Sequence, residues 1–289
     1  MIKLPETREQ MVVNLLKLAN TKIPADIGWA LEAAAMWETG PIASNQLGAI
    51  LDNIKKAEHL GRPMCQDTGI PTFFIRGRID AGVEEDIRNG LRTASQTIPL
   101  RPNTVDPFTR ENMGDNLGRG MPSIHYIPTD DDFTEISVLV KGAGSENMTR
   151  LGMLNPADGI KGVKRFVIDS VLDAGGRPCP PTIVGVGIGG TADSCLMMSK
   201  KALMAPLDSP SESDIARDIE EDLFVKLNRS GLGPMGLGGD TTVLAVKVRV
   251  ASCHTASLPV AVSIGCWATR RASVRISNGN VEYSQGASL

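Results

Sequence analysis

The apolar residues of this chain follow two different periods, and the order of these periods limits the folds it can adopt. From Glu6 to about Leu60 they recur near the helical period, as at Met11, Leu15 and Leu16, which predicts three helices. Beyond Leu60, short apolar runs alternate with helical stretches. The expected fold is therefore mixed α/β, with a helical N-terminal part packed on a mixed β-sheet body with flanking helices. We expect a single domain over residues 1–289, with 1–60 as the helical part and 61–289 as the body.

Glycine and proline mark the ends of the predicted elements in the body. Helices are predicted over residues 82–96, 158–174, 191–204 and 213–229. Strands are predicted over residues 72–75, 135–140, 182–188, 241–250, 258–264 and 273–276. Residues 99–131 are rich in proline, asparagine, glycine and aspartate and show little periodicity, so we interpret them as a long functional loop.

Charge and hydropathy exclude several classes of function. The formal net charge is −3, and the lysines and arginines form no basic cluster, so nucleic acid is not an expected partner. No apolar run reaches the roughly 18 residues of a membrane span, and the N-terminal stretch lacks the apolar core of a signal sequence. The prediction is a cytoplasmic protein that binds small molecules or other proteins.

The five cysteines are an odd number, widely spaced, and no pair has the C-x-x-C spacing of a zinc or redox motif. Reduced thiols or metal ligands are therefore expected instead of disulfides. Three of the five, Cys65, Cys179 and Cys266, stand beside glycine, proline or polar residues. Three thiolates from distant loops could share an iron–sulfur cluster, and a four-iron cube held by only three would leave one iron open for substrate.

Simpler explanations exist for the first two of these cysteines. Cys65 precedes Gln66 and Asp67, which can hydrogen-bond or move protons near a ligand. It could equally be a small buried residue in a turn. Cys179 stands among three prolines that stiffen its loop, which suits either rigid presentation of a ligand or a simple turn into a strand.

The remaining cysteines receive different interpretations. Cys266 follows a predicted apolar strand and precedes Arg270, whose charge would stabilise a thiolate. Cys195 falls in an apolar stretch of a predicted helix and is interpreted as core packing. Cys253 is adjacent to His254, but neighbouring side chains on a strand point to opposite faces. We interpret His254 as functional and Cys253 as a bystander.

Two polar segments have the composition of anion-binding loops. The segment from Lys141 to Asn147 contains Gly144 and follows a predicted strand, so its amide groups could cradle a carboxylate, although a plain turn explains it equally well. Arg101 and Arg110 lie in the long loop and could clamp a carboxylate through two hydrogen bonds each.

A glycine pattern in the body matches the dinucleotide-binding fingerprint by letter. Gly185-x-Gly187-x-x-Gly190 follows a predicted strand and precedes a predicted helix, as that motif requires. The acidic residue expected about 20 positions later should end a strand, yet Asp208 lies in a loop after a helix. Close helix packing, or an anion at the helix N-terminus, explains the glycines as well. A second glycine-rich stretch at 231–239 lacks the Gly-Lys-Ser/Thr ending of a P-loop.

Several motifs occur in a fixed order between about residue 60 and residue 271, and together they resemble the class I (iron–sulfur) fumarate hydratases, specifically their α subunit or N-terminal half. The motifs are Cys65-Gln66-Asp67-Thr68-Gly69, Lys141-Gly142-Ala143-Gly144-Ser145-Glu146-Asn147, Cys179-Pro180-Pro181, Gly236-Leu237-Gly238-Gly239-Asp240-Thr241-Thr242, and His254-Thr255-Ala256-Ser257-Leu258-Pro259 leading to Cys266.

The resemblance implies a [4Fe-4S] cluster held by Cys65, Cys179 and Cys266, whose remaining iron acts as a Lewis acid on a 2-hydroxy acid. It also implies that the catalytic groups include Asp67 and His254. The substrate contacts that it implies are Gln66, Arg101, Lys141 and the backbone at Gly144.

The resemblance implies a partner as well. In single-chain members of the family the catalytic base is a threonine in a Ser-Gly-Thr motif of the C-terminal half, and this chain contains no Ser-Gly-Thr. A separate β subunit carrying the catalytic threonine, in an α2β2 heterotetramer, is therefore expected. The expected reaction interconverts malate and fumarate. L(+)-tartrate dehydratase and mesaconate hydratase α subunits are the related alternatives, and an iron–sulfur redox sensor or regulatory subunit is the alternative from another class.

Overall fold

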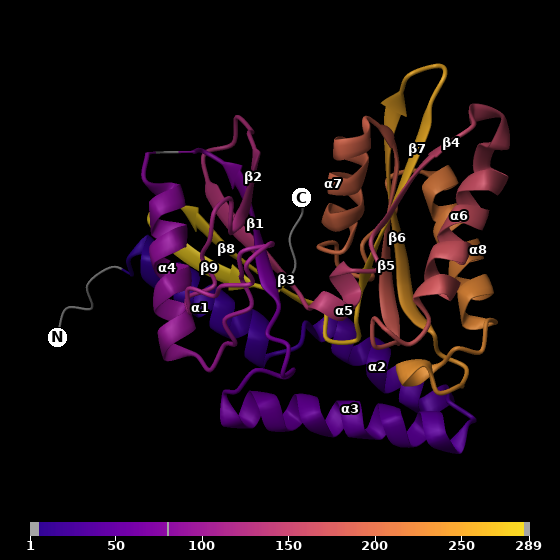
Figure 1. The fold of residues 1–289 in the computed structure, drawn as a ribbon, viewed down its shortest axis with the longest axis horizontal. Helices are drawn as coiled ribbons and strands as arrows, with labels where there is room; N and C mark the ends of the chain where they lie inside the picture. The colour runs from indigo at the N-terminus through magenta and orange to yellow at the C-terminus, as the bar shows by residue number, and fades with distance from the viewer. Residues whose placement is uncertain (1–5, 80, 286–289) are drawn as a thin grey trace. The chain divides into compact units, whose positions relative to one another are not determined.

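The computed structural model describes residues 6–79 and 81–285 and has the predicted mixed α/β class (Figure 1). The helices are α1 (Arg8–Thr21), α2 (Ala25–Trp37), α3 (Pro41–Leu60), α4 (Val83–Thr97), α5 (Ala143–Glu146), α6 (Gly159–Ala174), α7 (Ala192–Ala202) and α8 (Asp214–Asn228). The strands are β1 (Ile70–Gly77), β2 (Ser123–Ile127), β3 (Thr134–Lys141), β4 (Arg150–Leu154), β5 (Thr182–Gly190), β6 (Val243–Cys253), β7 (Leu258–Gly265), β8 (Arg270–Ser277) and β9 (Asn280–Ser284). Short 3-10 helices occur at Pro156–Asp158 and Pro234–Gly236.

The chain divides into two compact units, each assembled from separate stretches of sequence. Unit 1 combines the chain up to Pro24, Asn53–Gly142 and the chain from Arg270 onward, whereas unit 2 combines Ala25–Asp52 and Ala143–Thr269. The three predicted N-terminal helices are confirmed, but α1 belongs to unit 1 and α2 to unit 2. The single domain expected from the sequence stays a prediction, because compactness alone does not show whether the units fold independently.

Unit 1 is built on a five-stranded sheet in the order β2-β1-β3-β8-β9. Its β1 and β2 are parallel, and all its other neighbouring strands are antiparallel. Phe73 and Ile75 of β1 and Ile136 and Val138 of β3 are buried in one core with α1 and α4. Because residues two apart in a strand share a face, these side chains form the apolar face that the two helices cover. The register places the start of β1, the end of β3 and the start of β8 side by side, at the same end of the three central strands.

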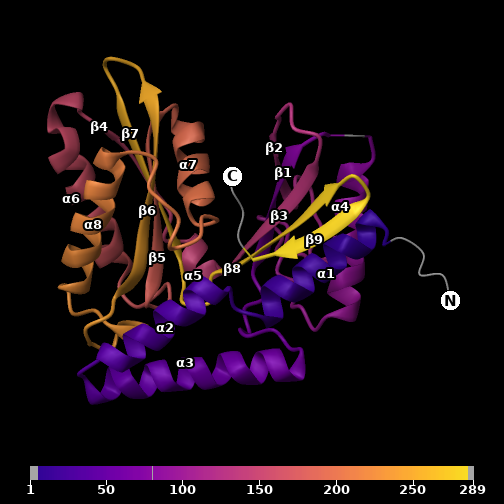
Figure 2. The same cartoon turned by 180° about the vertical axis from the view of Figure 1, so that it is seen from behind.

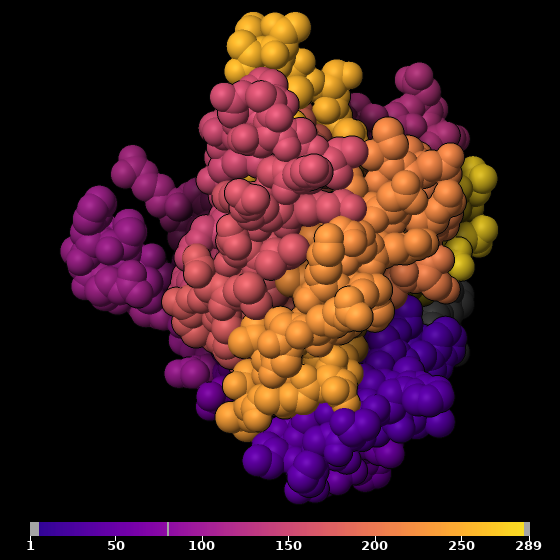
Figure 3. Space-filling model, turned by 90° about the vertical axis from the view of Figure 1, so that its right-hand side faces the viewer, coloured from indigo at the N-terminus to yellow at the C-terminus, as the bar shows by residue number. Residues whose placement is uncertain are grey.

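Unit 2 is built on a four-stranded sheet in the order β4-β7-β5-β6, with helices on both faces (Figures 1 and 2). On one face α7 packs on β5 and β7, and on the other α8 packs on β6 and α6 on β4 and β7. Figure 3 shows α6 and α8 side by side on the outer surface of this unit. Val184 and Val186 of β5 are buried in the core shared with α6 and α8. The strands β5 and β6 run parallel, whereas β7 runs antiparallel to β5.

Two glycines of β5 let the backbone of α7 pack directly on the strand. A β-carbon on Gly185 would lie 2.2 Å from the carbonyl oxygen of Ser199, and one on Gly187 would lie 2.2 Å from that of Cys195. Side chains cannot tolerate such distances, so glycine is required where helix and strand approach this closely. Helix packing, one of the explanations left open for the Gly185-x-Gly187-x-x-Gly190 pattern, therefore accounts for its first two glycines.

Three short strands are absent from the sequence prediction. The strand β2 lies inside the predicted loop 99–131, so the prediction of a continuous loop is wrong at Ser123–Ile127. The strands β2, β4 and β9 all lie at sheet edges. Edge strands are short and partly exposed, so their apolar alternation is weak in sequence and their pairing is decided by the neighbouring strand.

Glu135 is a buried carboxyl group in a row of charged residues across the sheet of unit 1. It lies on β3 opposite Arg76 of β1 and Arg275 of β8, and it is only 8% exposed. Burial raises the pKa of Glu135, and the two guanidinium groups oppose this shift only in part. The same guanidinium groups lie over the Phe133 ring, at 5.3 Å for Arg76 and 3.8 Å for Arg275. The folded unit thus favours a protonated Glu135 more than the unfolded chain does.

We expect Glu135→Gln to raise the melting temperature near neutral pH and to change it little near pH ~4. Because the pKa of Glu135 is raised on folding, the stability that its protonated form contributes is present at low pH and lost as the pH rises through the folded-state pKa. Glutamine has the shape of the protonated carboxyl group and does not titrate. Thermal unfolding of both proteins between about pH 4 and pH 8 measures the difference.

A neighbouring glutamate provides the matched control for this measurement. Glu282 of β9 lies opposite Arg275 on its other side, but it is exposed. The melting-temperature difference caused by Glu282→Gln should therefore change less with pH than that caused by Glu135→Gln. The same pH dependence in both variants would contradict the assignment of the effect to burial.

Candidate functional site

The loop that carries Cys65 is tied at its start to α1 and to the part of α3 that belongs to unit 1. The Met64 N–H donates to the backbone carbonyl of Asn20 in α1 at 2.9 Å, and the Asn53 side chain donates to the Met64 carbonyl at 2.8 Å. Cys65 itself is half-buried and Gln66 is exposed. The thiol is therefore held by an ordered backbone without being sealed in the core.

Asp67 is fixed both at its carboxylate and at its backbone. Its Oδ1 accepts hydrogen bonds from the Gly69 N–H at 3.0 Å and from the Asn103 side-chain amide at 3.3 Å. Its backbone carbonyl accepts one from Nη1 of Arg270 at 2.8 Å. A β-carbon on Gly142 would lie 2.8 Å from Oδ2 of Asp67, so the carboxylate fills space that a side chain at position 142 would need. The loop presents this carboxylate in a defined orientation.

The two predicted cationic contacts, Arg101 and Lys141, lie next to the same loop. The Arg101 N–H donates to Oγ1 of Thr68 at 2.9 Å, and its side chain is exposed. Lys141 is the buried last residue of β3, and a β-carbon on Gly69 would lie 2.6 Å from its carbonyl oxygen. Gly69 also has a φ of +74°, so only glycine suits this entry into β1. Unit 1 thus brings together Cys65, Gln66, Asp67, Arg101 and Lys141.

Cys179 and Cys266 lie in adjoining loops at one end of the sheet of unit 2. Cys179 precedes β5 and Cys266 follows β7, and these strands pair at Ile183 and Gly265. The Trp267 N–H donates to the Cys179 carbonyl at 3.2 Å. Both cysteines are partly exposed, and none of the five cysteines of the chain is in a disulfide. Two cysteines far apart in sequence are therefore neighbours in the fold.

The backbone of Cys179 has a left-handed conformation, with φ at 56°. This conformation costs a residue with a side chain about 1–2 kcal/mol relative to glycine. Its N–H donates to the Gly176 carbonyl at 3.1 Å, which closes a tight turn. Strain of this kind gathers at functional sites, where the side chain is needed despite its cost. The simple strand-entry turn that the sequence left open would not require a cysteine here.

Gly144 lies beside the Cys179 loop. A β-carbon at Gly144 would lie 2.7 Å from the carbonyl oxygen of Arg177, two residues before Cys179. The segment predicted as an open loop of amide groups instead forms the short helix α5, in which Glu146 pairs with Lys200 at 2.7 Å. Unit 2 thus brings together Gly144, Cys179 and Cys266.

The glycine-rich stretch at 231–239 supports the Cys179 loop and has no sign of a phosphate cradle. The Met235 N–H donates to the Pro180 carbonyl at 2.8 Å. At the end of the stretch, the Glu38 carboxylate accepts the Asp240 N–H at 3.0 Å. The carboxylate of Glu38 occupies the backbone donors that follow the stretch, so a structural role explains this motif.

His254 lies at the end of the unit 2 sheet opposite to the two cysteines. It is in the exposed turn between β6 and β7, and its Nδ1 accepts the Ala256 N–H at 3.1 Å. The tip of this hairpin projects beyond its neighbours in Figure 3. Since β7 has 8 residues, its ends are about 23 Å apart. Within unit 2 the structure therefore does not bring His254 to Cys179 or Cys266.

The other two cysteines lie where the sequence places them. Cys195 is fully buried in α7, its Sγ donates to the Gly187 carbonyl at 3.3 Å, and burial raises the pKa of its thiol to about 11. Cys253 is exposed at the end of β6 and donates to the Ser257 carbonyl at 3.2 Å. A thiol with so high a pKa is a poor ligand, so core packing explains Cys195.

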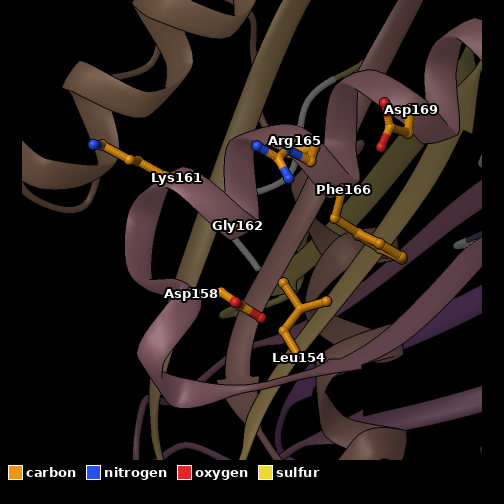
Figure 4. A pocket seen from close by; sticks show the side chains of 7 residues that line it. All are labelled: Leu154, Asp158, Lys161, Gly162, Arg165, Phe166 and Asp169. Carbon is orange, nitrogen blue, oxygen red and sulfur yellow. The ribbon is translucent and has the colours of Figure 1, made fainter.

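A pocket of about 320 Å³ on the surface of α6 contains none of the predicted site residues (Figure 4). Its charged lining residues are all exposed, namely Asp158, Lys161, Arg165 and Asp169. Charged groups in contact with water need no ligand, so the chemistry of the loops described above is a stronger guide to the site than this hollow.

Two residues of the unit 1 site were missed from the sequence. Asn103 donates to Asp67 and, at 3.1 Å, to the Gly69 carbonyl. Arg270 was noted only as a cation near Cys266, yet it is 1% exposed. Neither asparagine in a polar loop nor arginine at the start of a strand rich in arginine and serine carries a distinctive sequence signal.

The described residues contain no group of three or more histidine, cysteine, aspartate or glutamate side chains arranged to hold a single metal ion. Among the helices that the structure describes, none is long and apolar enough to cross a membrane.

Comparison with known proteins gives consistent matches over most of the chain. The family model "Fumarate hydratase (Fumerase)" matches residues 9–275. A protein of Methanocaldococcus jannaschii provisionally named L(+)-tartrate dehydratase subunit alpha is 45% identical, over 92% of this chain and 96% of that protein. The L(+)-tartrate dehydratase subunit alpha of Escherichia coli is 34% identical, over 92% and 90%. A provisionally named class I fumarate hydratase of Geobacillus stearothermophilus is 34% identical, over 96% of this chain but 55% of that protein.

Proposed function

This chain belongs to the fumarate hydratase family, and we propose that it acts as the α subunit of a [4Fe-4S] hydro-lyase. A hydro-lyase adds water to a carbon–carbon double bond and removes it again. The relatives are named tartrate dehydratase or fumarate hydratase, and both names describe an activity of this kind.

We propose Cys65, Cys179 and Cys266 as the cluster ligands. The observation that carries this proposal is the pairing of the strained Cys179 turn with the Cys266 loop through the Trp267 hydrogen bond. Cysteine thiolates are the usual ligands of iron–sulfur clusters, and the partial exposure of all three residues suits a group that must meet substrate. When bound, a cluster with one iron free of thiolate supplies a Lewis acid for the substrate hydroxyl.

The other predicted residues, most of which lie in unit 1, suit a dicarboxylate substrate. We propose that Asp67 holds or moves a proton next to the substrate, because its carboxylate is oriented by the Gly69 N–H and the Asn103 amide. Arg101 can bind a carboxylate through two parallel hydrogen bonds. The substrate contacts proposed besides Arg101 are Gln66, Lys141 and the backbone N–H of Gly144.

The proposed role of His254 requires a second α subunit. Its place at the far end of the unit 2 sheet separates it from Cys179 and Cys266 of the same chain by more than about 20 Å. We propose that the exposed hairpin tip brings His254 to the site of a neighbouring copy, as an α2β2 assembly allows.

A β subunit completes the proposed enzyme. Two relatives are named subunit alpha, and this chain covers 90% or more of the length of each. These names support a partner subunit in the proposed complex. We propose that this β subunit carries the catalytic threonine and that the complex is cytoplasmic.

The proposed substrate is the malate and fumarate pair, with L(+)-tartrate as the second candidate. Tartrate is a candidate substrate because the M. jannaschii protein, which is 45% identical to this chain, has a tartrate dehydratase name. Mesaconate stays a third possibility, because it is also an unsaturated dicarboxylate.

The test is to purify the chain with and without its β subunit, load the cluster anaerobically, and assay malate, L-tartrate and citramalate. We expect about four iron and four sulfide per α chain and turnover of one substrate only when both subunits are present. A fully loaded complex that turns over none of the three would overturn the hydro-lyase and favour the redox-sensor alternative. Full activity of the α chain alone would overturn the β-subunit proposal.

A further inference from the structure

We infer that Arg270 is a positioning residue, whose buried guanidinium group holds the Cys65–Asp67 loop in the shape that cluster binding requires. This inference rests on the proposed function. Nothing in the family motifs assigns a role to Arg270, which follows Cys266 by four residues. The five-residue stretch from Cys266 to Arg270 thus carries one proposed ligand and the group that fixes the loop of another.

The contacts of Arg270 define this role. Its Nη1 donates to the Asp67 carbonyl at 2.8 Å and to Oδ1 of Asn20 at 3.3 Å. Asn20 is 1% exposed, and its own carbonyl accepts the Met64 N–H at 2.9 Å. Arg270 and Asn20 therefore hold the backbone on both sides of Cys65, at Met64 and at Asp67.

The position of Arg270 in the sheet fixes the guanidinium group that contacts the Asp67 carbonyl and Asn20. Arg270 is the first residue of β8 and lies opposite Val140 of β3, which is buried. It is 1% exposed, and its Nε is buried without a hydrogen-bond partner among the described residues. A cation removed from water retains its hydrogen bonds strongly, because few alternative acceptors exist inside the protein. The Nε–H of Arg270 is therefore a donor that suits an anionic group.

The chemistry of arginine explains why lysine would not replace it fully. The guanidinium group is planar and reaches several acceptors at fixed angles, whereas an ammonium group on a flexible stem does not fix their relative positions. A lysine at position 270 would retain the charge and most of the volume but would hold the Asp67 carbonyl and Asn20 less firmly.

The next residue shows that burial of arginine alone does not create this role. Arg271 is 0% exposed and also lies in β8, but its Nε donates to the Gln285 carbonyl at 3.2 Å, near the end of the described chain. Neighbouring residues of a strand point to opposite faces, so the two arginines serve different surroundings. Arg271→Lys is therefore the matched control for Arg270→Lys.

The first test measures the loop in the cluster-free chain by alkylating thiols with iodoacetamide and following each cysteine by mass spectrometry. Loss of the hydrogen bond from the charged guanidinium group to the partly buried Asp67 carbonyl is expected to speed alkylation of Cys65 about tenfold in Arg270→Lys, and more in Arg270→Gln. The rate at the exposed Cys253 should not change, and Arg271→Lys should leave both rates as in the wild type.

The second test measures the rate at which a chelator removes iron from the loaded chain. A loosened Cys65 loop should release iron about tenfold faster in Arg270→Lys than in Arg271→Lys. Unchanged Cys65 alkylation in folded Arg270 variants, or equal effects of Arg270→Lys and Arg271→Lys, would overturn the inference, as would failure of both Arg270 variants to fold. If the wild-type chain takes up no cluster, the proposed function fails, while the alkylation experiment still decides whether Arg270 positions the loop.

Discussion

Replacing Cys179 by glycine is expected to abolish cluster binding by this chain while leaving its cluster-free fold at least as stable as the wild type. The backbone at position 179 has a φ of 56°, a conformation that glycine adopts without the cost of about 1–2 kcal/mol borne by other residues. Removing the thiol takes away one of three proposed ligands. Iron content after anaerobic reconstitution should fall from about four per chain to below about one, and turnover of the αβ complex should fall at least about 1,000-fold.

Alanine at the same position separates the ligand role from the backbone role. Cys179→Ala also removes the thiol but retains a side chain at positive φ, so its cluster-free form should be about 1 kcal/mol less stable than Cys179→Gly. Urea unfolding of both cluster-free variants measures this difference. The two variants should bind equally little iron.

The other cysteines complete the comparison. Cys65→Ala and Cys266→Ala should lose iron as Cys179→Gly does, whereas Cys195→Ser and Cys253→Ser should retain it. Cys65 and Cys266 belong to partly exposed loops. Cys195 is fully buried in α7, and Cys253 is exposed at a hairpin tip. Iron binding that is equal in all variants would refute the proposed ligand set.

Local periodicity was sufficient to predict the elements that carry a strong apolar face. The helix predicted at 158–174 is α6 (Gly159–Ala174), and the strand predicted at 258–264 is β7 (Leu258–Gly265). In α6 the buried residues recur at the helical period, whereas β7 is buried along nearly its whole length and so reads as a continuous apolar run. The edge strand β2 could not be found in this way, because its residues are mostly half-buried and it exists only through pairing with β1.

The motifs nominate residues for the candidate site but say nothing about their geometry. Motifs marked Cys179 and Cys266, but their proximity depends on the pairing of β5 with β7, which no local pattern encodes. The same dependence explains His254: its motif suggests a site residue, whereas the length of β7 carries it away from the cysteines of its own unit. The left-handed backbone conformation of Cys179 could likewise not be predicted from the prolines around it.

A different substitution should destabilise the whole of unit 2 without touching the proposed ligands. Gly187→Ala should lower the free energy of unfolding by about 3 kcal/mol or more, because overpacking of a rigid contact typically costs about 1–3 kcal/mol and here the new atom meets backbone. Its β-carbon would lie 2.2 Å from the Cys195 carbonyl and 3.1 Å from the Ser199 nitrogen. The backbone of a helix cannot rotate away as a side chain can, so α7 must shift from β5. Thermal or urea unfolding measures the loss.

The matched control is Gly48→Ala in α3, where a new β-carbon would have no atom within 4 Å. Alanine is a better helix former than glycine by about 1 kcal/mol, so this variant should be as stable as the wild type or more so. Equal stability of Gly187→Ala and Gly48→Ala would show that α7 can move off β5 at little cost. A loss of stability in Gly187→Ala but not in Gly48→Ala is the result expected from helix packing, because the Gly187 β-carbon would meet the backbone of α7.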